Sequence, residues 1–307
     1  MSLKENINKN LETIAESKSA EQVEQAIDSL DKLKLSQQLN KSSLERFKGA
    51  LGNCLLMFLD EPNAHPRYRN WLATYFGQVE ARFADSRQQA KYMYYPELEP
   101  KPWFDESDFK SLEKNKTQRE KTIRELTELI NEGAGFEAYV KGEMKDDAWS
   151  TLVNSDDWGA LPLVNGQGKS KVLGRLPETD SLIKSLPLAE LSPMAPEVFL
   201  SRLKPGVCLP PHYGLSNLKV TAHLPVILPE SEKLSITVGD ETRTWRANEW
   251  LIFDDSFLHS ARNDSEEERI VLICDFWNPI LTEEEQSRLT LAIKVIEKAN
   301  SLFRGWA

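Results

Sequence analysis

The sequence predicts an α+β protein in which an N-terminal all-α region precedes a double-stranded β-helix, a jelly-roll or cupin-like barrel, flanked by helices. Two observations predict this fold class. From Lys4 to about Tyr95, apolar residues recur every three or four positions, which is the period of a helix packed on one face. From Val198 to Trp277 the period changes to two, as expected for short antiparallel strands in succession. We therefore expect two domains, residues 1–95 and 96–307.

Several helices are expected in the first domain. One apolar stripe begins at Leu11 and a second at Val23. Ser42 comes before a third stripe and has Glu45 three residues later, which is the arrangement of a capping box. A further helix is expected from about residue 68 to residue 83.

The segment between the helical region and the strands contains a connector, a helix and loops. Three prolines within residues 96–102 exclude a helix interior, so this stretch is expected to be extended. A charged helix is expected from about residue 106 to residue 132, ended by Gly133. Residues 142–195 are polar and interrupted by glycine and proline, and we expect long loops with short strands there.

The strands of the barrel are expected at residues 198–203, 218–224, 234–238, 241–245, 250–253 and 269–276. In the second of these, Lys219, Thr221 and His223 share one face and the apolar residues share the other. Gly239-Asp240 is expected to form a hairpin turn. The last predicted helix begins after Thr282, its expected N-cap, and runs to about residue 303.

Charge and cysteine content narrow the partners and the compartment. The chain carries 38 basic and 48 acidic residues, a formal net charge of −10, which repels phosphate backbones and anionic lipid. No apolar stretch approaches the roughly 20 residues of a membrane span, and the polar start does not resemble a signal peptide. Three cysteines without a CxxC spacing favour a reducing compartment. We expect a cytoplasmic protein whose partner is a small molecule or a peptide, not a nucleic acid or a membrane.

Histidine is the residue that points to chemistry. The chain has four histidines, and three of them lie in the strand-rich segment. His212 follows the turn Pro205-Gly206, and His259 begins a returning strand four residues before Asn263. Neighbouring strands of a barrel can direct both imidazoles into its mouth, so we expect a metal site. Neutral imidazole binds Fe, Zn, Cu or Ni, and these residues alone do not choose the metal.

A third ligand is not evident from the sequence. Many non-haem iron sites use two histidines and a carboxylate two residues after the first histidine, and that position here is Gly214, which has no side chain. Three alternatives follow. The metal has two protein ligands and water, or Asp254 or Asp255 supplies a carboxylate, or His223 is a third ligand.

Four segments together resemble a known family. They read PGVCLPPHYGLSN, AHLPVILP, WLIFDDSFLHSARN and ERIVLICDFWNP. Residues 198–281 resemble the catalytic domain of the aspartyl/asparaginyl β-hydroxylases, which are Fe(II)- and 2-oxoglutarate-dependent dioxygenases with a double-stranded β-helix fold. The segments YYPELEPKPWFD and DDWGALPL extend the resemblance more loosely. It accounts for Gly214, because the family has glycine there, and it implies that His212 and His259 hold the iron.

The resemblance also implies a cosubstrate pocket. Arg269, ten residues after His259, would pair with the far carboxylate of 2-oxoglutarate, as a planar guanidinium can do with two parallel hydrogen bonds. Ser201, His223 and Trp158 match the other residues around the cosubstrate. The chain departs from the family at Thr221, where the family usually carries a cosubstrate-binding arginine. Lys219, on the same strand face, is the candidate to replace that charge.

The activity that the resemblance implies is hydroxylation of an amino-acid or peptidyl substrate of the Asp or Asn type, with release of succinate and CO₂. A membrane-anchored branch of the family acts on lipid A acyl chains, and the lack of a membrane segment argues against that branch. Two alternatives remain. One is a cupin-type metalloenzyme that does not use 2-oxoglutarate. The other is a non-catalytic barrel binding protein, for which Gly214 and Thr221 are the motivation.

Overall fold

The computed structural model describes residues 2–143, 147–166, 168–229 and 232–304, and its contacts divide the chain into two compact units. One unit is helical and comprises the residues up to Arg82, Leu191–Pro193 and the segment from Thr282 onward. The other comprises Phe83–Glu190 and Met194–Leu281 and contains all the strands. The C-terminal helix therefore groups with the N-terminal helices, and a domain boundary at residue 95 stays a prediction.

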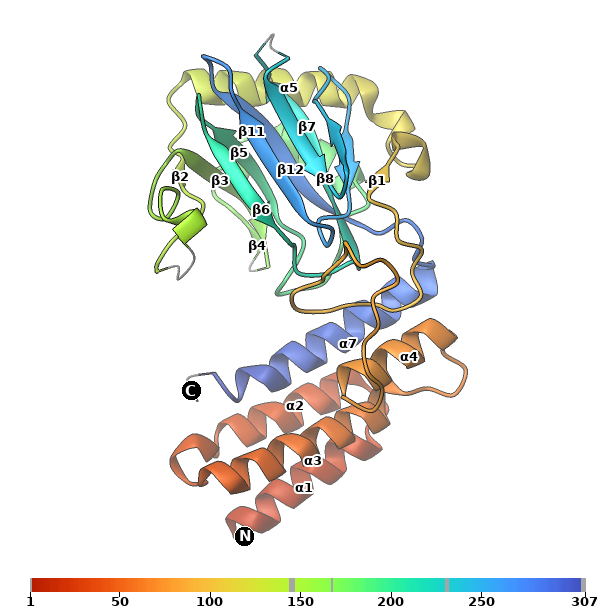
Figure 1. The fold of residues 1–307 in the computed structure, drawn as a ribbon. Coiled ribbons are helices and arrows are strands. Elements are labelled where there is room, and N and C mark those ends of the chain that lie inside the picture. Colours follow the sequence, from red (N-terminus) through yellow and green to blue (C-terminus); the bar gives the residue numbers. More distant parts are fainter. Residues whose placement is uncertain (1, 144–146, 167, 230–231, 305–307) are drawn as a thin grey trace. The chain divides into compact units, whose positions relative to one another are not determined.

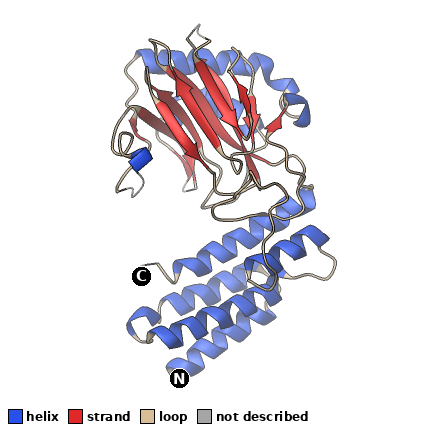
Figure 2. Ribbon diagram, viewed as in Figure 1, coloured by secondary structure: helices blue, strands red, loops and turns tan. Residues whose placement is uncertain are grey.

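The helical unit contains five α-helices among its described residues (Figures 1 and 2): α1 (Leu3–Glu16), α2 (Ala20–Asp31), α3 (Lys41–Leu59), α4 (Pro66–Tyr75) and α7 (Glu283–Ser301). Ile14, Val23 and Leu51 are at most 2% exposed, so the predicted apolar stripes do form the core of this unit. Helix α7 begins with the expected capping box, in which Thr282 and Glu285 bond reciprocally.

Two expectations for this unit were wrong. Helix α4 ends at Tyr75, not near residue 83, because Gly77 has a φ of +73° and ends the helical conformation there. Helix α3 is capped by Asn40, whose side chain accepts a hydrogen bond from the backbone N–H of Ser43 at 2.9 Å, and not by Ser42. Asn40 is an equally good N-cap and lies two residues earlier.

The strand-rich unit has two antiparallel sheets. The larger has the order β1-β10-β7-β12-β5-β3-β2, with β4 paired to β3, and the smaller has the order β6-β11-β8-β9. The strands are β1 (Trp103–Phe104), β2 (Glu137–Ala138), β3 (Trp158–Asn165), β4 (Gly168–Lys169), β5 (Val198–Leu203), β6 (Cys208–His212), β7 (Lys219–Ile227), β8 (Leu234–Val238), β9 (Glu241–Arg243), β10 (Leu251–Phe253), β11 (His259–Asn263) and β12 (Arg269–Trp277).

Each face of the larger sheet packs into its own core. On one face, Val220 of β7 and Leu272 of β12 pack with residues of α5 (Lys116–Asn131) and α6 (Pro177–Ser185), and Figure 1 shows α5 lying along the sheet. On the other face, Ile273 of β12 packs with Ile236 of the smaller sheet. The two facing sheets form the predicted double-stranded β-helix barrel, and the fold class is confirmed.

The period of two located the central strands correctly, and two expectations for the rest of this unit were wrong. The hairpin turn at Gly239-Asp240 is confirmed, because Val238 pairs with Glu241. The helix expected from residue 106 begins only at Lys116, after two short 3-10 turns. Residues 142–195 contain, besides loops, the eight-residue strand β3 and the nine-residue helix α6, and the helix was not expected.

Candidate metal and cosubstrate site

A cavity of about 410 Å³ lies between the two sheets and is lined by residues of both. All six site residues expected from the sequence line it: Trp158, Ser201, His212, His223, His259 and Arg269. They come from β3, β5, β6, β7, β11 and β12, which are separated by as much as 111 residues along the chain. The alternation along the strands directs these side chains to the inner face, opposite the core formed with α5 and α6.

His212 and His259 are direct neighbours across a strand pair. Strand β6 pairs antiparallel with β11 so that the two residues are in register, and their ring centroids are 4.1 Å apart. The Nδ1 atom of His212 lies 2.8 Å from the carbonyl oxygen of Pro210, and that of His259 lies 2.9 Å from the carbonyl oxygen of Phe257. Because a carbonyl can only accept, each Nδ1 carries the proton and each Nε2 keeps its lone pair.

Burial keeps this histidine pair neutral. It lowers the pKa of His212 and lowers that of His259 to about 4, where the neighbouring His212 adds to the effect. At neutral pH both rings are therefore uncharged, with their Nε2 lone pairs available. Two such nitrogens fit a divalent transition metal, for which neutral imidazole is the common protein ligand.

The position of the missing carboxylate is filled from the loop that follows β10. A Cβ atom added to Gly214 would lie 2.3 Å from the carboxyl group of Asp255, so no side chain fits there while Asp255 keeps its place. The Oδ1 atom of Asp255 is buried and has no hydrogen-bond partner within the described residues. The described residues contain no group of three His, Cys, Asp or Glu side chains that could hold a metal, so the geometry favours two protein ligands.

Asp254 is directed away from the cavity and organises the loop before His259. Its carboxylate accepts hydrogen bonds from the Ser256 backbone N–H at 2.9 Å and from Gln88 Nε2 at 3.0 Å. Burial raises the pKa of Asp254 to about 7. Since Asp254 does not line the cavity, it is excluded as a candidate ligand.

His223 has the opposite hydrogen-bonding pattern to the histidine pair. The indole Nε1–H of Trp245 donates to Nδ1 of His223 at 3.2 Å, so in the neutral ring the proton lies on Nε2. Burial and the nearby Arg269 hold the pKa of His223 well below its usual value. A neutral histidine with a protonated Nε2 can donate a hydrogen bond to an anion but has no lone pair there for a metal.

Arg269 is a buried cation that has no counter-ion among the described residues. The residue is only 2% exposed, and no carboxylate within the described chain forms an ion pair with it. Its guanidinium lies 4.8 Å from the ring centroid of Trp245, and its Nε has no hydrogen-bond partner. Burial lowers its pKa to about 9, which still leaves it charged at neutral pH. Because an unpaired buried charge is costly, this arginine is arranged to receive an anion.

Ser201 and Trp158 bond to one another at the wall of the cavity. Trp158 Nε1 donates to Ser201 Oγ at 3.2 Å, and the two residues are 7% and 1% exposed. The serine hydroxyl uses one lone pair for this bond and keeps its own proton to donate.

Lys219 is not free to replace the family arginine. Its Nζ lies 3.0 Å from Asp255 Oδ2 and 2.8 Å from Asp275 Oδ1, and these two carboxylates raise its pKa despite burial. Thr221 donates from Oγ1 to Asp255 Oδ2 at 3.1 Å. Both residues at the point of departure from the family therefore hold Asp255 in place.

Some lining residues could not be expected from the sequence. Trp149 lies edge-on to His212 with 5.1 Å between ring centroids, and Tyr139 lies 4.2 Å from Trp158. The sequence also gave no expectation for two other residues. Glu197 lines the cavity, and Trp245 orients His223 through a hydrogen bond. Their only sequence signal is aromatic or acidic character in a polar segment, which does not distinguish them from ordinary surface residues.

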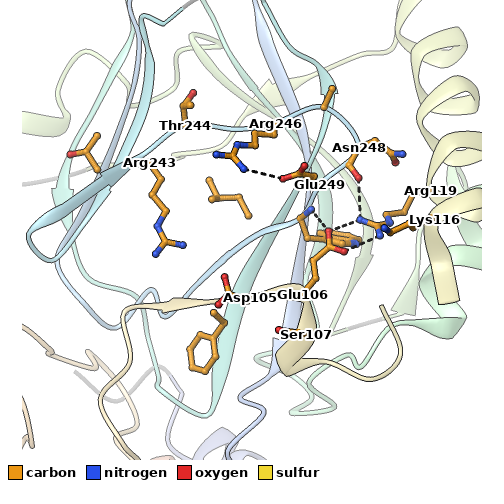
Figure 3. A pocket seen from close by; sticks show the side chains of 15 residues that line it. Asp105, Glu106, Ser107, Lys116, Arg119, Arg243, Thr244, Arg246, Asn248 and Glu249 are labelled. Atoms are coloured by element: carbon orange, nitrogen blue, oxygen red, sulfur yellow. Dashed lines mark hydrogen bonds and ion pairs between the residues drawn. The ribbon is translucent and has the colours of Figure 1, made fainter. Parts of the chain in front are cut away.

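A larger cavity, about 870 Å³, lies outside this site beside α5 and the turn between β9 and β10 (Figure 3). Ion pairs within the wall engage two of its cations, because Arg119 lies 2.6 Å from Glu106 and Arg246 lies 3.8 Å from Glu249. No histidine or cysteine lines it. It therefore lacks the nitrogen and sulfur ligands of a transition-metal site.

The fold is a jelly-roll barrel, and its cavity holds two adjacent buried histidines and a buried arginine that makes no ion pair with the described residues. A family model described as aspartyl/asparaginyl beta-hydroxylase matches residues 117–279, more than half of the chain. The chain belongs to this family, and the resemblance seen in the sequence is confirmed.

Individual relatives match parts of the chain. The human aspartyl/asparaginyl beta-hydroxylase is 28% identical over 216 residues, covering 69% of this chain and 27% of the relative. An ornithine lipid ester-linked acyl 2-hydroxylase of Rhizobium tropici is 40% identical over 81 residues, covering 26% of this chain and 29% of the relative. The chain thus spans under a third of either relative. A solved prolyl-4-hydroxylase of Pseudomonas putida aligns with a TM-score of 0.34 and 15% identity, covering 53% of this chain and 88% of that one.

No described helix combines the length and the apolar character needed to cross a bilayer. A cytoplasmic location stays a prediction.

Proposed function

We propose that this chain is an Fe(II)- and 2-oxoglutarate-dependent dioxygenase that hydroxylates an amino-acid or peptidyl substrate, consumes O₂ and releases succinate and CO₂. One observation carries the proposal. The same cavity holds two neutral imidazoles with free Nε2 lone pairs and a buried arginine that lacks a counter-ion. The first feature suits a transition metal and the second suits a dicarboxylate.

The residues divide the work as follows. His212 and His259 would hold the iron through Nε2, with Nδ1–H anchored on backbone carbonyls that fix the ring orientation. When bound, iron supplies the oxidation chemistry with O₂ and 2-oxoglutarate. Arg269 and the Ser201 hydroxyl would bind the far carboxylate of the cosubstrate, and His223 would donate to it from Nε2.

Asp255 and two tryptophans border the histidine pair and shape its surroundings. The Oδ1 atom of Asp255 has no hydrogen-bond partner among the described residues, so this cavity-lining carboxylate can still accept a hydrogen bond. The aromatic residues Trp149 and Trp158 border His212 and limit the access of bulk water.

The names of the relatives favour an Asp- or Asn-like substrate, and one relative is named for a lipid acyl chain, so the substrate class needs its own argument.

The test is anaerobic titration of the Fe(II) protein with 2-oxoglutarate, followed by the visible charge-transfer absorption of the iron chelate. We expect a band in the wild type that is lost in His212→Ala, while Arg269→Ala weakens cosubstrate binding at least about tenfold. Arg243→Ala is the matched control, because Arg243 also packs on a tryptophan, 4.5 Å from the ring centroid of Trp103, but lies outside this cavity.

The outcomes separate the alternatives. Tight metal binding without a band, or a band equally strong in Arg269→Ala, would favour a cupin-type metalloenzyme of other chemistry. A normal band without succinate formation in air would favour a binding protein without turnover.

A further inference from the structure

We infer that the substrate carries a cationic group, an ammonium or a guanidinium, which binds between Glu197 and the aromatic wall formed by Tyr139, Trp149 and Trp158 (hereafter the aromatic wall). This inference deepens the proposed function, on which it rests for the reaction but not for the binding. It also disfavours an aspartate side chain at this place, although the family is named for one.

The first argument is the charge of the cavity. Its lining contains two cations, Lys219 and Arg269, and three carboxylates, Glu197, Asp255 and Asp275, which sum to −1, and imidazoles that bind a metal do so as neutral ligands and add no charge. Fe(II) and the 2-oxoglutarate dianion carry equal and opposite charges, so loading the site leaves this sum unchanged. A negative cavity attracts cations and repels a second carboxylate.

The second argument is that no cation remains for an acidic substrate. Lys219 is engaged by Asp255 and Asp275 at 3.0 and 2.8 Å, and its side chain is 12% exposed. Arg269 is the residue assigned to the cosubstrate. Thr221 contributes only a hydroxyl, which already donates to Asp255. An incoming substrate carboxylate would therefore have no cation within the described lining to pair with.

The third argument is Glu197. Glu197 lines the cavity and its carboxylate has no ion pair or hydrogen bond within the described chain, while its backbone N–H donates to Asp275 Oδ2 at 3.0 Å. Burial and then the negative charge of Asp275 raise the pKa of Glu197. An arriving cation would relieve this repulsion, since it would supply the missing partner to a carboxylate held close to two others.

The fourth argument is the aromatic wall beside it. The Tyr139 ring lies 4.2 Å from the Trp158 ring, and the Trp149 and Trp158 rings are stacked with 6.1 Å between centroids. Burial raises the pKa of Tyr139, and the negative charge of the nearby Glu197 adds to this rise. Aromatic faces attract cations, most strongly when water is partly excluded. Carboxylates and aromatic rings in one cavity are the combination that recognises ammonium and guanidinium groups.

The experiment compares three blocked amino acids that differ in charge. N-acetyl-arginine amide, N-acetyl-citrulline amide and N-acetyl-aspartate amide are titrated calorimetrically into the anaerobic, Fe(II)- and 2-oxoglutarate-loaded protein. Arginine and citrulline have nearly the same shape, so their difference reports the charge. We expect arginine to bind about tenfold more tightly than citrulline, and aspartate to bind more weakly than both. Equal binding of arginine and citrulline, or tighter binding of aspartate, would overturn the inference.

Two variants locate the effect. Glu197→Gln is expected to reduce the arginine-over-citrulline preference to about twofold or less, while Glu190→Gln, which removes an exposed carboxylate outside the cavity, leaves it unchanged. Thr221→Arg is expected to reverse the preference toward aspartate, because it adds a cation to the cavity lining. A preference that survives Glu197→Gln intact would overturn the assignment of this residue.

The charge-transfer band recorded on the same samples separates this inference from the proposed function. If the band is absent but the arginine preference persists, the dioxygenase proposal fails and the binding site stands. If the band is present and the preference is absent, only the present inference fails.

Discussion

Gly214 and Asp255 share a space that holds only one side chain. The backbone N–H of Gly214 donates to the carbonyl of Asp255 at 2.6 Å, and a Cβ at residue 214 would lie 2.3 Å from the Asp255 carboxyl group. Lys219 and Thr221 hold that carboxyl group from the other side. The glycine is therefore a steric requirement of this cavity, and a carboxylate cannot simply be added to complete a triad.

Gly214→Asp should consequently destabilise the protein and not create a third ligand. Two carboxylates forced into one buried space would clash and repel, so we expect a loss of about 2–4 kcal/mol in the free energy of unfolding. Urea denaturation measures this loss. The double variant Gly214→Asp with Asp255→Gly removes the clash and is expected to recover at least half of it. A single variant as stable as the wild type would contradict this account of Gly214.

Asp254 makes stability depend on pH. Its pKa in the folded protein is about 7, above the usual 3.8, because burial disfavours the charged form. The folded state thus holds this proton more tightly than the unfolded state, so its contribution to stability is complete below pH 4 and is lost as the pH rises through 7. Asp254→Asn stays neutral and is expected to flatten this fall, which is on the order of 3 kcal/mol.

Urea unfolding at pH 5 and pH 8 tests this expectation. The exposed carboxylate variant Asp31→Asn serves as the control and should keep the pH dependence of the wild type. An Asp254→Asn protein with the same dependence as wild type would mean that another group is responsible.

At the scale of elements, the start of helix α7 depends on a buried carboxylate. Glu285 is completely buried, completes the capping box with Thr282, and accepts from Arg67 Nε at 3.0 Å and Arg67 Nη2 at 2.7 Å. Glu285→Gln keeps the side chain's shape and its capping ability but leaves the guanidinium without its counter-charge. We expect a loss of about 2–4 kcal/mol.

The neighbouring residue gives a matched control for this prediction. Glu284 is exposed and bonds Arg288 one turn later at 2.9 Å, so Glu284→Gln should cost no more than about 0.5 kcal/mol. Thermal denaturation of both variants measures the difference. If the two variants lose equal stability, the Arg67–Glu285 pair does not hold this helix.

Local sequence patterns predicted the strands and helices whose faces pack against the same kind of surroundings along their whole length. In β7 one face packs against helices and the other lines the cavity, so polar and apolar residues alternate at its start, whereas β12 is recognised as a continuous apolar run from Ile270 to Cys274; both strands were found within a few residues. Helix α6 was missed although Pro177 at its first turn and the acidic Glu178 and Asp180 are start signals, because its nine residues are too few to show a clear period.

Only those residues of the candidate site that lie on paired strands could be predicted from the sequence. His212 and His259 could be expected on neighbouring strands, and their direct register agrees with that expectation. Asp255 fills the space at Gly214, and Tyr139 and Glu197 line the same cavity, because distant segments of the chain pack together. A single sequence does not encode such contacts in any local pattern, so the details of substrate recognition required the structure.

At the scale of the whole molecule, the net charge of the chain and the charge of the cavity have the same sign. The chain carries −10 overall, and the cavity lining sums to −1. A protein of this charge attracts cationic ligands over about one Debye length, near 8 Å at physiological salt, and repels anionic ones. Long-range attraction and local recognition therefore favour the same class of substrate.

This agreement predicts that association of a cationic ligand is sensitive to salt. For a peptide with one arginine and no acidic residue, raising the ionic strength from about 0.02 to 0.5 M should slow association about fivefold or more, because screening removes the attraction. The citrulline form of the same peptide should change by less than about twofold. Stopped-flow tryptophan fluorescence can follow both, since Trp149 and Trp158 line the cavity. A salt effect of equal size in both peptides would show that the charge of the protein does not steer its ligand, and the preference for cations would then have to come from contacts inside the cavity alone.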